Sequence, residues 1–168
     1  MTDEMLEDPR ITAMGLFVEA FTGVTARLNV QLAEHGLGNV DFEVLVRLAR
    51  SPGGELRMTD LAAQTGLSTS GVTRVVDRLE RDGLATRRAC PTDRRGSFTV
   101  VTPAGVAKMH EVLPDHLALI DEWFTGRLSP EHLETLLSGL RTIRDAVRPG
   151  ATSGVADQSR TTETHRAA

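Results

Sequence analysis

The stretch TDLAAQTGLSTSGVTRVVDRLERDGLATRRACPTDRRGSFTVVT, residues 59–102, decides the fold. It contains two short amphipathic helical patterns separated by a glycine, followed by two runs of strand-forming residues around a turn. Leu61 and Ala62 are expected to face inward in the first helix. Gly66 stands just past its end, where a positive φ is common. This order of elements predicts a winged helix-turn-helix, a module that reads duplex DNA.

The second helical pattern has one apolar and one polar face. Ser68 or Thr69 can cap its N-terminus through a hydroxyl, and Gly83 is expected to end it. The apolar stripe, at positions i, i+3, i+4 and i+7, consists of Val72, Val75, Val76 and Leu79. The opposite face carries Thr69, Ser70, Thr73, Arg74, Asp77, Arg78 and Arg81. Short hydroxyl side chains near the N-terminus would let this helix lie deep in a major groove, as a recognition helix does.

Thr73 and Arg74 are the side chains predicted to reach base edges or phosphates, since arginine to guanine is the commonest specific contact. Arg78 and Arg81 lie further along the helix and are expected to meet phosphate or to pair with Asp77. An ordinary amphipathic helix with a solvated charged face is the alternative. This helix taken alone does not decide between the two.

The following segment favours DNA recognition. LATRRA and SFTVVT flank CPTDRRG over residues 84–102. β-branched and aromatic residues favour strands, and proline, aspartate and glycine favour the turn between them. Arg94 and Arg95 are therefore expected side by side at the tip of a hairpin, where arginines can enter a minor groove. Asp93 would orient one of them by a charge-assisted hydrogen bond. A solubilising turn explains one such charge better than an adjacent pair.

Charge is distributed unevenly along the chain. Seven arginines and four acidic residues fall between Ser68 and Arg95, a local excess of three positive charges in a chain whose formal net charge is −4. A basic patch on an acidic protein is the footprint expected of a defined nucleic-acid contact face. Repulsion elsewhere on the surface would limit non-specific adhesion to DNA.

These residues resemble the multiple antibiotic resistance regulator (MarR) family. The matching stretches are FEVLVRLARSPGGELRMTDLA, STSGVTRVVDRLERDGLATRRACPTDRRG and VTPAG, and with the flanking helical segments the resemblance covers roughly residues 10–147. Cys90 stands where the family often has a polar residue, and Val101 where leucine is more usual.

The resemblance implies a homodimeric transcription regulator, usually a repressor, that is often released from DNA by a small molecule or by oxidation. Ser70, Thr73 and Arg74 match the family's recognition-helix contacts, and Asp93, Arg94 and Arg95 match its wing motif. The DNA-binding residues expected from sequence and resemblance together are Ser68, Thr69, Ser70, Thr73, Arg74, Arg78, Asp93, Arg94 and Arg95.

The segments on either side of the module are predicted to be helices with more apolar positions than one small module can bury. A long first helix stops at Gly36, and Asp41 is expected to cap a second one. Their surplus apolar surface, with that of the last two helices, is predicted to pack against a second copy. Two-fold pairing would match two DNA half-sites one turn apart. An intramolecular helical bundle is the alternative.

The last two helices begin at recognisable caps. Thr102 caps a helix that has Pro103 at its first position, a favoured arrangement. Pro114 removes an internal hydrogen bond, so it is expected to kink or restart that helix. Ser129 and Pro130 open the final helix.

The predicted fold class is therefore mainly α: a winged helix-turn-helix with long N- and C-terminal dimerisation helices and a small β-hairpin wing. The expected organisation is a flexible N-terminus (1–9), a MarR-type domain (10–147) and a disordered tail (148–168). Within the domain, the dimerisation helices (10–36 and 103–147) surround the winged module (41–102).

Composition excludes several classes of protein. The acidic N-terminus and the absence of any run of about 20 apolar residues argue against a signal peptide or a membrane partner, so the chain is expected in the cytoplasm. One cysteine excludes an internal disulfide framework. The five histidines are scattered, so no metal or other cofactor is predicted. No nucleophile elbow, phosphate-binding loop or metalloprotease motif is present, so an enzyme is not expected.

The signal that controls DNA binding is left open by the sequence. A small, partly apolar or aromatic effector is expected in a pocket between the dimer helices and the winged module, lined by Phe17, Phe21, Phe42, Arg47, His110 and Trp123. Cys90 lies among arginines, which lower a thiol pKa, so oxidation there is the rival signal; an inert strand residue is the simpler reading. A winged-helix module that binds protein in place of DNA is the remaining alternative.

Overall fold

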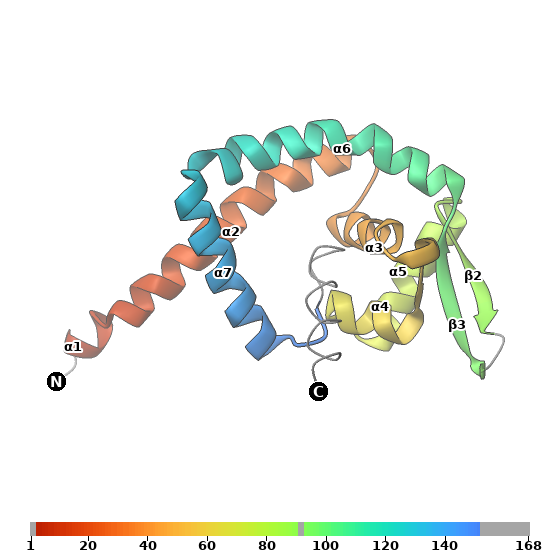
Figure 1. The fold of residues 1–168 in the computed structure, drawn as a ribbon, viewed down its shortest axis with the longest axis horizontal. Coiled ribbons are helices and arrows are strands. Elements are labelled where there is room, and N and C mark those ends of the chain that lie inside the picture. The colour runs from red at the N-terminus through yellow and green to blue at the C-terminus, as the bar shows by residue number, and fades with distance from the viewer. Residues whose placement is uncertain (1–2, 91–92, 152–168) are drawn as a thin grey trace.

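The computed structural model describes residues 3–90 and 93–151 (Figure 1). Its helices are α1 (Asp3–Leu6), α2 (Pro9–Glu34), α3 (Asn39–Ala49), α4 (Met58–Thr65), α5 (Thr69–Arg81), α6 (Pro103–Trp123) and α7 (Pro130–Val147). Its strands are β1 (Glu55–Arg57), β2 (Ala85–Cys90) and β3 (Asp93–Val101). The predicted fold class is confirmed.

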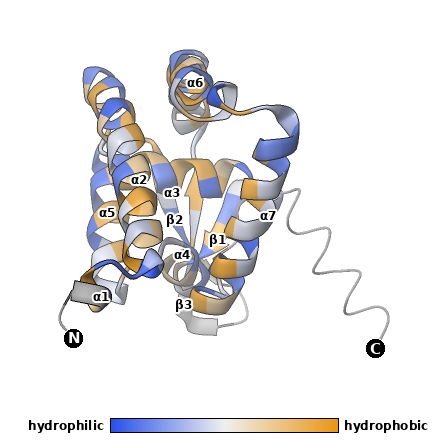
Figure 2. Cartoon of the chain, turned by 90° about the vertical axis from the view of Figure 1, so that its left-hand side faces the viewer, coloured by the Kyte–Doolittle hydropathy of each residue, from blue (hydrophilic) through white to orange (hydrophobic). Residues whose placement is uncertain are grey.

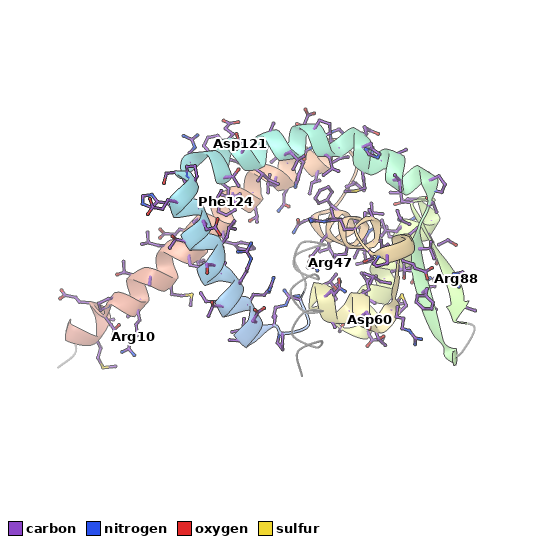
Figure 3. All side chains as sticks on the ribbon, viewed as in Figure 1. Arg10, Arg47, Asp60, Arg88, Asp121 and Phe124 are labelled. Carbon is purple, nitrogen blue, oxygen red and sulfur yellow. The ribbon has the colours of Figure 1, made fainter. Side chains whose placement is uncertain are left out.

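The molecule has two parts (Figure 1). Helices α2 and α6 run antiparallel and side by side as a long arm, and α3, α4, α5 and the sheet form a lobe at one end of it. Helix α7 turns back from the far end of α6 toward α4. Helix α6 therefore runs from the hairpin to the opposite end of the arm (Figure 3). Arg88 marks the hairpin, on the side where α6 begins, and Asp121 and Phe124 mark the other end of α6.

The core lies in the lobe and at its junction with the arm. The four apolar residues predicted to form one stripe of α5, from Val72 to Leu79, are all buried. They pack in one cluster with Leu45 of α3, Leu61 of α4 and Val112 of α6. Each fully buried aliphatic side chain of this kind contributes about 1.5–3 kcal/mol to stability. The amphipathic pattern of α5 is thus used fully, and its polar face is left for solvent.

Two glycines are required by the local geometry. Gly66 ends α4 with φ 69°, as predicted. Gly105, in the first turn of α6, is buried so close to the carbonyl oxygen of Leu84 that a Cβ at this position would clash with it. Thr102 caps α6, as predicted, and its hydroxyl also donates to the carbonyl of Gly83 at 2.7 Å. The start of α6 is therefore fixed to the turn that follows α5.

The predicted hairpin is part of a three-stranded antiparallel sheet in the order β1-β3-β2. Sequence reasoning missed β1, because three residues after a Gly-Gly turn carry no periodic pattern. Leu56 pairs with Thr99, and Thr86 pairs with Val100 on the other side of β3. Strand β3 begins at Asp93, so the second strand of the hairpin starts closer to the turn than the predicted run SFTVVT.

One helix-boundary prediction was wrong, and one was narrowed. Asp41 does not cap α3, which begins at Asn39 after Gly38; Asp41 lies in the first turn and is buried. Of the two alternatives predicted for Pro114, a kink or a restart, the restart does not occur, because α6 continues through this residue. The carbonyl that loses its partner there belongs to exposed His110, so water can satisfy it.

Apolar side chains are exposed on the arm and on α7. Hydrophobic positions recur along both α2 and α7 (Figure 2). The exposed apolar side chains include Ile11, Met14, Leu16, Phe17, Val18, Phe21 and Val30 of α2 and Leu136, Ile143 and Val147 of α7. Among the described residues, α2 is the one helix long and apolar enough to cross a membrane, and its apolar stretch is not buried within the chain. An exposed apolar surface of this extent marks an interaction face.

Candidate DNA-binding interface

The N-terminus of α5 is open to solvent and rich in hydroxyl groups. Ser68 is the N-cap, one of the two candidates from sequence; its Oγ accepts from the backbone N–H of Gly71 at 3.1 Å and lies 3.1 Å from the Oγ of Ser70. Thr69 and Ser70 are exposed in the first turn, where backbone N–H groups lack intrahelical partners. The positive end of the helix dipole is therefore presented together with three short donors, an arrangement that suits a phosphate.

Arg74 is the cation on this face that the fold leaves available. Its side chain is exposed, and no hydrogen bond or ion pair joins it to the rest of the described chain. Thr73, beside it and partly exposed, donates from Oγ1 to the carbonyl of Thr69 at 2.8 Å. Arg81, the last residue of the helix, is 71% exposed and bonds only weakly to neighbouring Asp82, at 3.3 Å.

Arg78 is held inside the fold. Its Nε donates to both carboxylate oxygens of Asp41 at 2.9 Å, and this bond raises the pKa of the Arg78 guanidinium. Asp41 is 6% exposed. The pair therefore fixes the outer end of α5 to the first turn of α3. The pairing with Asp77 considered from the sequence does not occur, because Asp77 is engaged elsewhere.

Arg87 of β2 makes the second attachment. It donates to the carboxylates of Glu80 and Asp77, the latter at 2.7 Å, and to the carbonyl of Thr73 at 3.3 Å. Its backbone N–H also donates to Glu80 at 2.6 Å. Helix α5 is thus tied to the wing on one side and to α3 on the other. Sequence reasoning identified neither attachment, because the partners are chosen by the way the elements pack.

Arg88 belongs to the sheet. Its guanidinium donates to both carboxylate oxygens of Glu55 at 2.6 and 2.7 Å and lies over the ring of Phe98, 5.0 Å from the centroid. Arg57 stacks on the same ring at 5.3 Å. Three of the arginines counted as the basic patch, Arg78, Arg87 and Arg88, are therefore partly neutralised by carboxylates of the fold. The patch available to a ligand is narrower than the sequence count indicates.

The predicted wing residues lie at the start of β3. Asp93, Arg94 and Arg95 are the first three residues of β3, directly after 91–92. The two arginines therefore lie in the strand next to the turn and not in the turn. Their side chains, and that of Cys90, lie outside the described part of the structure. The hairpin of β2 and β3 projects from the lobe, at the end of the molecule opposite α1 (Figure 1).

The residues proposed to line an effector pocket are placed apart. Phe17 and Phe21 stack on each other on exposed α2, with ring centroids 6.5 Å apart. Phe42 is buried in α3 and packs on the ring of His116 at 4.3 Å. Trp123, at the far end of α6, lies beneath the guanidinium of Arg27 at 4.1 Å.

The other two proposed pocket residues, Arg47 and His110, do not join these aromatic residues in one pocket. Arg47 forms an ion pair with Glu43 one turn earlier on α3, at 2.7 Å. His110 is exposed on α6. Of the six, Trp123 lines an open cleft of about 670 Å³ between α2 and α6, together with Val30, Gln31 and Leu119.

A buried polar contact lies where the arm meets the lobe. The Gln31 side chain donates from Nε2 to the carbonyl of Val112 at 3.3 Å, which turns its Oε1 toward His116 Nδ1 at 2.9 Å. Nδ1 of His116 is therefore the donor. His116 is 5% exposed, and burial lowers its pKa. Because Phe42 of α3 covers the ring, this contact joins α2, α6 and α3.

The described residues contain no group of three or more His, Cys, Asp or Glu side chains placed to hold a metal ion.

Comparisons with known proteins agree with this geometry. The MarR family model matches residues 35–96. The HTH-type transcriptional regulator MhqR of Bacillus subtilis is 32% identical over 124 residues, covering 74% of this chain and 83% of that protein. Among solved structures, AbsC, a MarR family transcriptional regulator from Streptomyces coelicolor, superposes with a TM-score of 0.80 and 35% identity over 84% of this chain and 96% of its own.

A second solved structure is that of Sco3205, a MarR family transcriptional regulator from Streptomyces coelicolor, in complex with DNA. It superposes with a TM-score of 0.78 and 32% identity, covering 82% of this chain and 87% of its own. The likeness extends over both the lobe and the arm.

Proposed function

The chain belongs to the MarR family of DNA-binding transcriptional regulators, and from this premise we propose that it is a cytoplasmic homodimeric repressor that binds a pseudo-palindromic operator through α5 and the β2–β3 wing. In this proposal Arg74 and Thr73 contact base edges in the major groove. Ser68, Thr69 and Ser70 bind phosphate at the helix N-terminus. Arg94 and Arg95 enter the adjacent minor groove.

The carrying observation is the combination on α5 of one unpaired exposed arginine with two rigid attachments. Arg78–Asp41 and Arg87–Glu80 hold the helix, whereas Arg74 has no partner in the described chain. A fixed helix that presents a free guanidinium and a hydroxyl-rich N-terminus is suited to a groove, because the helix backbone needs little further ordering on binding and the ordering cost falls mainly on the Arg74 side chain. Arg78 contributes here by fixing the helix more than by meeting phosphate.

The dimer is supported by the exposed apolar residues of α2 and α7. Phe17 and Phe21 are 51% and 61% exposed, and Ile143 and Val147 are 57% and 69% exposed. Surfaces of this kind on a regulator of duplex DNA are explained by a second copy, which also supplies the second recognition helix for a two-fold site. The same pairing accounts for the apolar composition of α2 without a membrane.

Release by a small molecule is the proposed regulation. The cleft between α2 and α6 reaches Gln31, whose side chain bonds to His116 at the junction of arm and lobe. An apolar or aromatic molecule there would act if it preferred the arrangement that does not fit DNA. The rival signal is oxidation of Cys90. A protein whose Cys90→Ser variant keeps DNA binding but no longer releases DNA in peroxide would be redox-regulated.

The test is a salt series of DNA-binding measurements with the chain's own promoter fragment. Binding through phosphates and bases requires affinity to fall steeply as salt rises, in proportion to the phosphates neutralised. Arg74→Ala is the informative variant and Arg141→Ala, on α7, is the matched control. Salt-independent binding, or no binding to any duplex, would favour the winged-helix protein-interaction alternative.

A further inference from the structure

The chain leaves α7 through a tight turn formed by residues 148–151, which we call the C-terminal turn. The backbone N–H of Arg148 still donates to the carbonyl of Arg144 at 2.6 Å, and that of Ala151 donates to the carbonyl of Arg148 at 3.0 Å. Ala151 is 9% exposed although it follows a helix with no buried residue. The sequence predicts a disordered tail from residue 148, so this turn is a feature of the tertiary structure.

The C-terminal turn docks on the corner of the helix-turn-helix. Arg148 donates from Nη2 to the carbonyl of Gln64 at 3.1 Å, in the last turn of α4. Carbonyls in the last turn of a helix lack internal donors and lie at the negative end of its dipole, so a guanidinium is a suitable partner. Gly150 lies against Ala63 of the same helix, since a Cβ on the glycine would be 3.5 Å from that of Ala63.

The guanidinium of Arg148 also lies against Gly66, the exposed residue at which the chain turns from α4 to α5. A Cβ at Gly66 would lie 2.6 Å from Nη2 and 2.8 Å from Cζ of Arg148. A side chain at Gly66 is therefore disfavoured by the φ of 69°, and it would also require the Arg148 guanidinium to move away. The turn that orients α5 thus contacts the end of α7 directly.

We propose that Arg148 is a positioning residue: through the C-terminal turn it fixes the helix-turn-helix corner to α7 and so sets the place of α5 relative to the dimerisation helices. The consequence for DNA rests on the proposed function. If α7 is held by the partner copy, each recognition helix is located from two ends, through α6 on one side and through Arg148 on the other. Loss of Arg148 then loosens the spacing that a two-fold operator requires.

The test measures this geometry without DNA. Thr59→Cys on α4 and Ser138→Cys on α7, in a Cys90→Ser background, carry spin labels, and labelled chains are diluted in excess unlabelled protein to isolate the intrachain distance. We expect one narrow distance distribution, which broadens in Arg148→Ala, is partly restored in Arg148→Lys and is unchanged in the control Arg141→Ala. An equal width in Arg148→Ala and its parent would overturn the proposal.

A second measurement separates this proposal from the proposed function. Duplexes are first selected from a random pool by the wild-type protein. The spacing between their two half-sites is then lengthened or shortened one base pair at a time. We expect Arg148→Ala to bind the optimal spacing about tenfold more weakly, the scale of one charge-assisted hydrogen bond, and to lose the sharp spacing optimum. Equal weakening at every spacing overturns the positioning role. If the wild type selects no duplex, the proposed function fails, while the distance measurement still decides whether Arg148 fixes the corner.

Discussion

At the scale of single residues, the arginines of this chain divide by partner. Arg78, Arg87 and Arg88 each meet a carboxylate of another element, at 2.7 Å or less. Arg74 stands on the same helix as Arg78 and has no partner in the described chain. The number of arginines in the sequence therefore overstates the positive charge available to DNA, because some of these arginines pair with carboxylates that hold the elements together.

Arg74→Ala is expected to weaken operator binding by about 1–3 kcal/mol, the worth of a good base contact, and random-sequence binding by less. Competition titrations against operator and random duplexes provide the measurement. Arg81→Ala serves as the comparison. Loss of a phosphate contact is expected to lower both affinities alike and to reduce the salt dependence of binding. Equal losses on the two duplexes for Arg74→Ala would restrict this residue to phosphate.

Asp41→Asn is expected to lower the free energy of unfolding by about 1–2 kcal/mol, less than a fully buried pair because the Arg78 side chain is 41% exposed and can turn to solvent. Urea denaturation measures the loss. In a double-mutant cycle with Arg78→Gln, the two losses should not add, because each removes the same interaction. Additive losses would show that the two side chains do not interact in solution.

At the scale of elements, the junction of arm and lobe contains a buried polar contact beside the apolar core. His116 of α6 bonds to Gln31 of α2 and lies against Phe42 of α3. Burial disfavours the charged imidazole, so the pKa of His116 lies below its ordinary value of 6.5. Stability from the neutral ring is thus fully present above the unfolded pKa and is lost as pH falls through the folded pKa.

The melting temperature is accordingly expected to drop as pH falls below about 6.5. His116→Phe should flatten this part of the pH profile, whatever its effect at neutral pH. His110→Asn, on the exposed side of the same helix, is the control and should keep the wild-type slope. A wild-type slope in His116→Phe would assign the acid sensitivity to other groups.

At the scale of the whole molecule, the described chain exposes apolar surface outside its lobe. The lobe has a closed core, whereas α7 has no buried residue and α2 exposes Phe17, Phe21 and Val30. Figure 2 colours hydrophobic positions orange along both helices. The surface that a second copy would cover is therefore on the arm and α7, away from the recognition face of α5.

Phe17→Glu is expected to weaken the dimer by at least about 30-fold, since a desolvated and unpaired charge costs roughly 2–5 kcal/mol in an interface. Phe17→Leu, which keeps the surface apolar, should leave the dimer intact. Light scattering across a dilution series measures both. A wild-type protein that is monomeric at micromolar concentration would contradict the two-fold operator model as a whole.

Truncation tests the same assembly by another route. Removal of the chain from Ser129 onward should abolish the dimer, because α7 and its exposed apolar row are lost. Removal of residues 152–168 should not. Sedimentation velocity on the two truncations provides the measurement, and a dimeric protein without α7 would assign the interface to α2 alone.

The sequence by itself determined the parts of this protein whose information is local. The stripe of α5, the Thr102 cap, the positive φ of Gly66 and the hairpin strands all follow from residue type and spacing within one turn or one strand pair. The cap of α5 is narrowed by the sequence to Ser68 or Thr69, and the structure selects Ser68. The family resemblance rests on the same continuous stretch and is confirmed by relatives that align over it.

The tertiary structure alone decided which charged groups meet. Asp41 and Arg78 are 37 residues apart and Arg148 and Gln64 are 84 apart, and no periodicity links either pair. Strand β1 exists because β3 offers it an edge, and Asp41 is a buried partner instead of a cap because α5 brings Arg78 against it. Long-range ion pairs depend on the relative placement of packed elements, which local propensity does not encode.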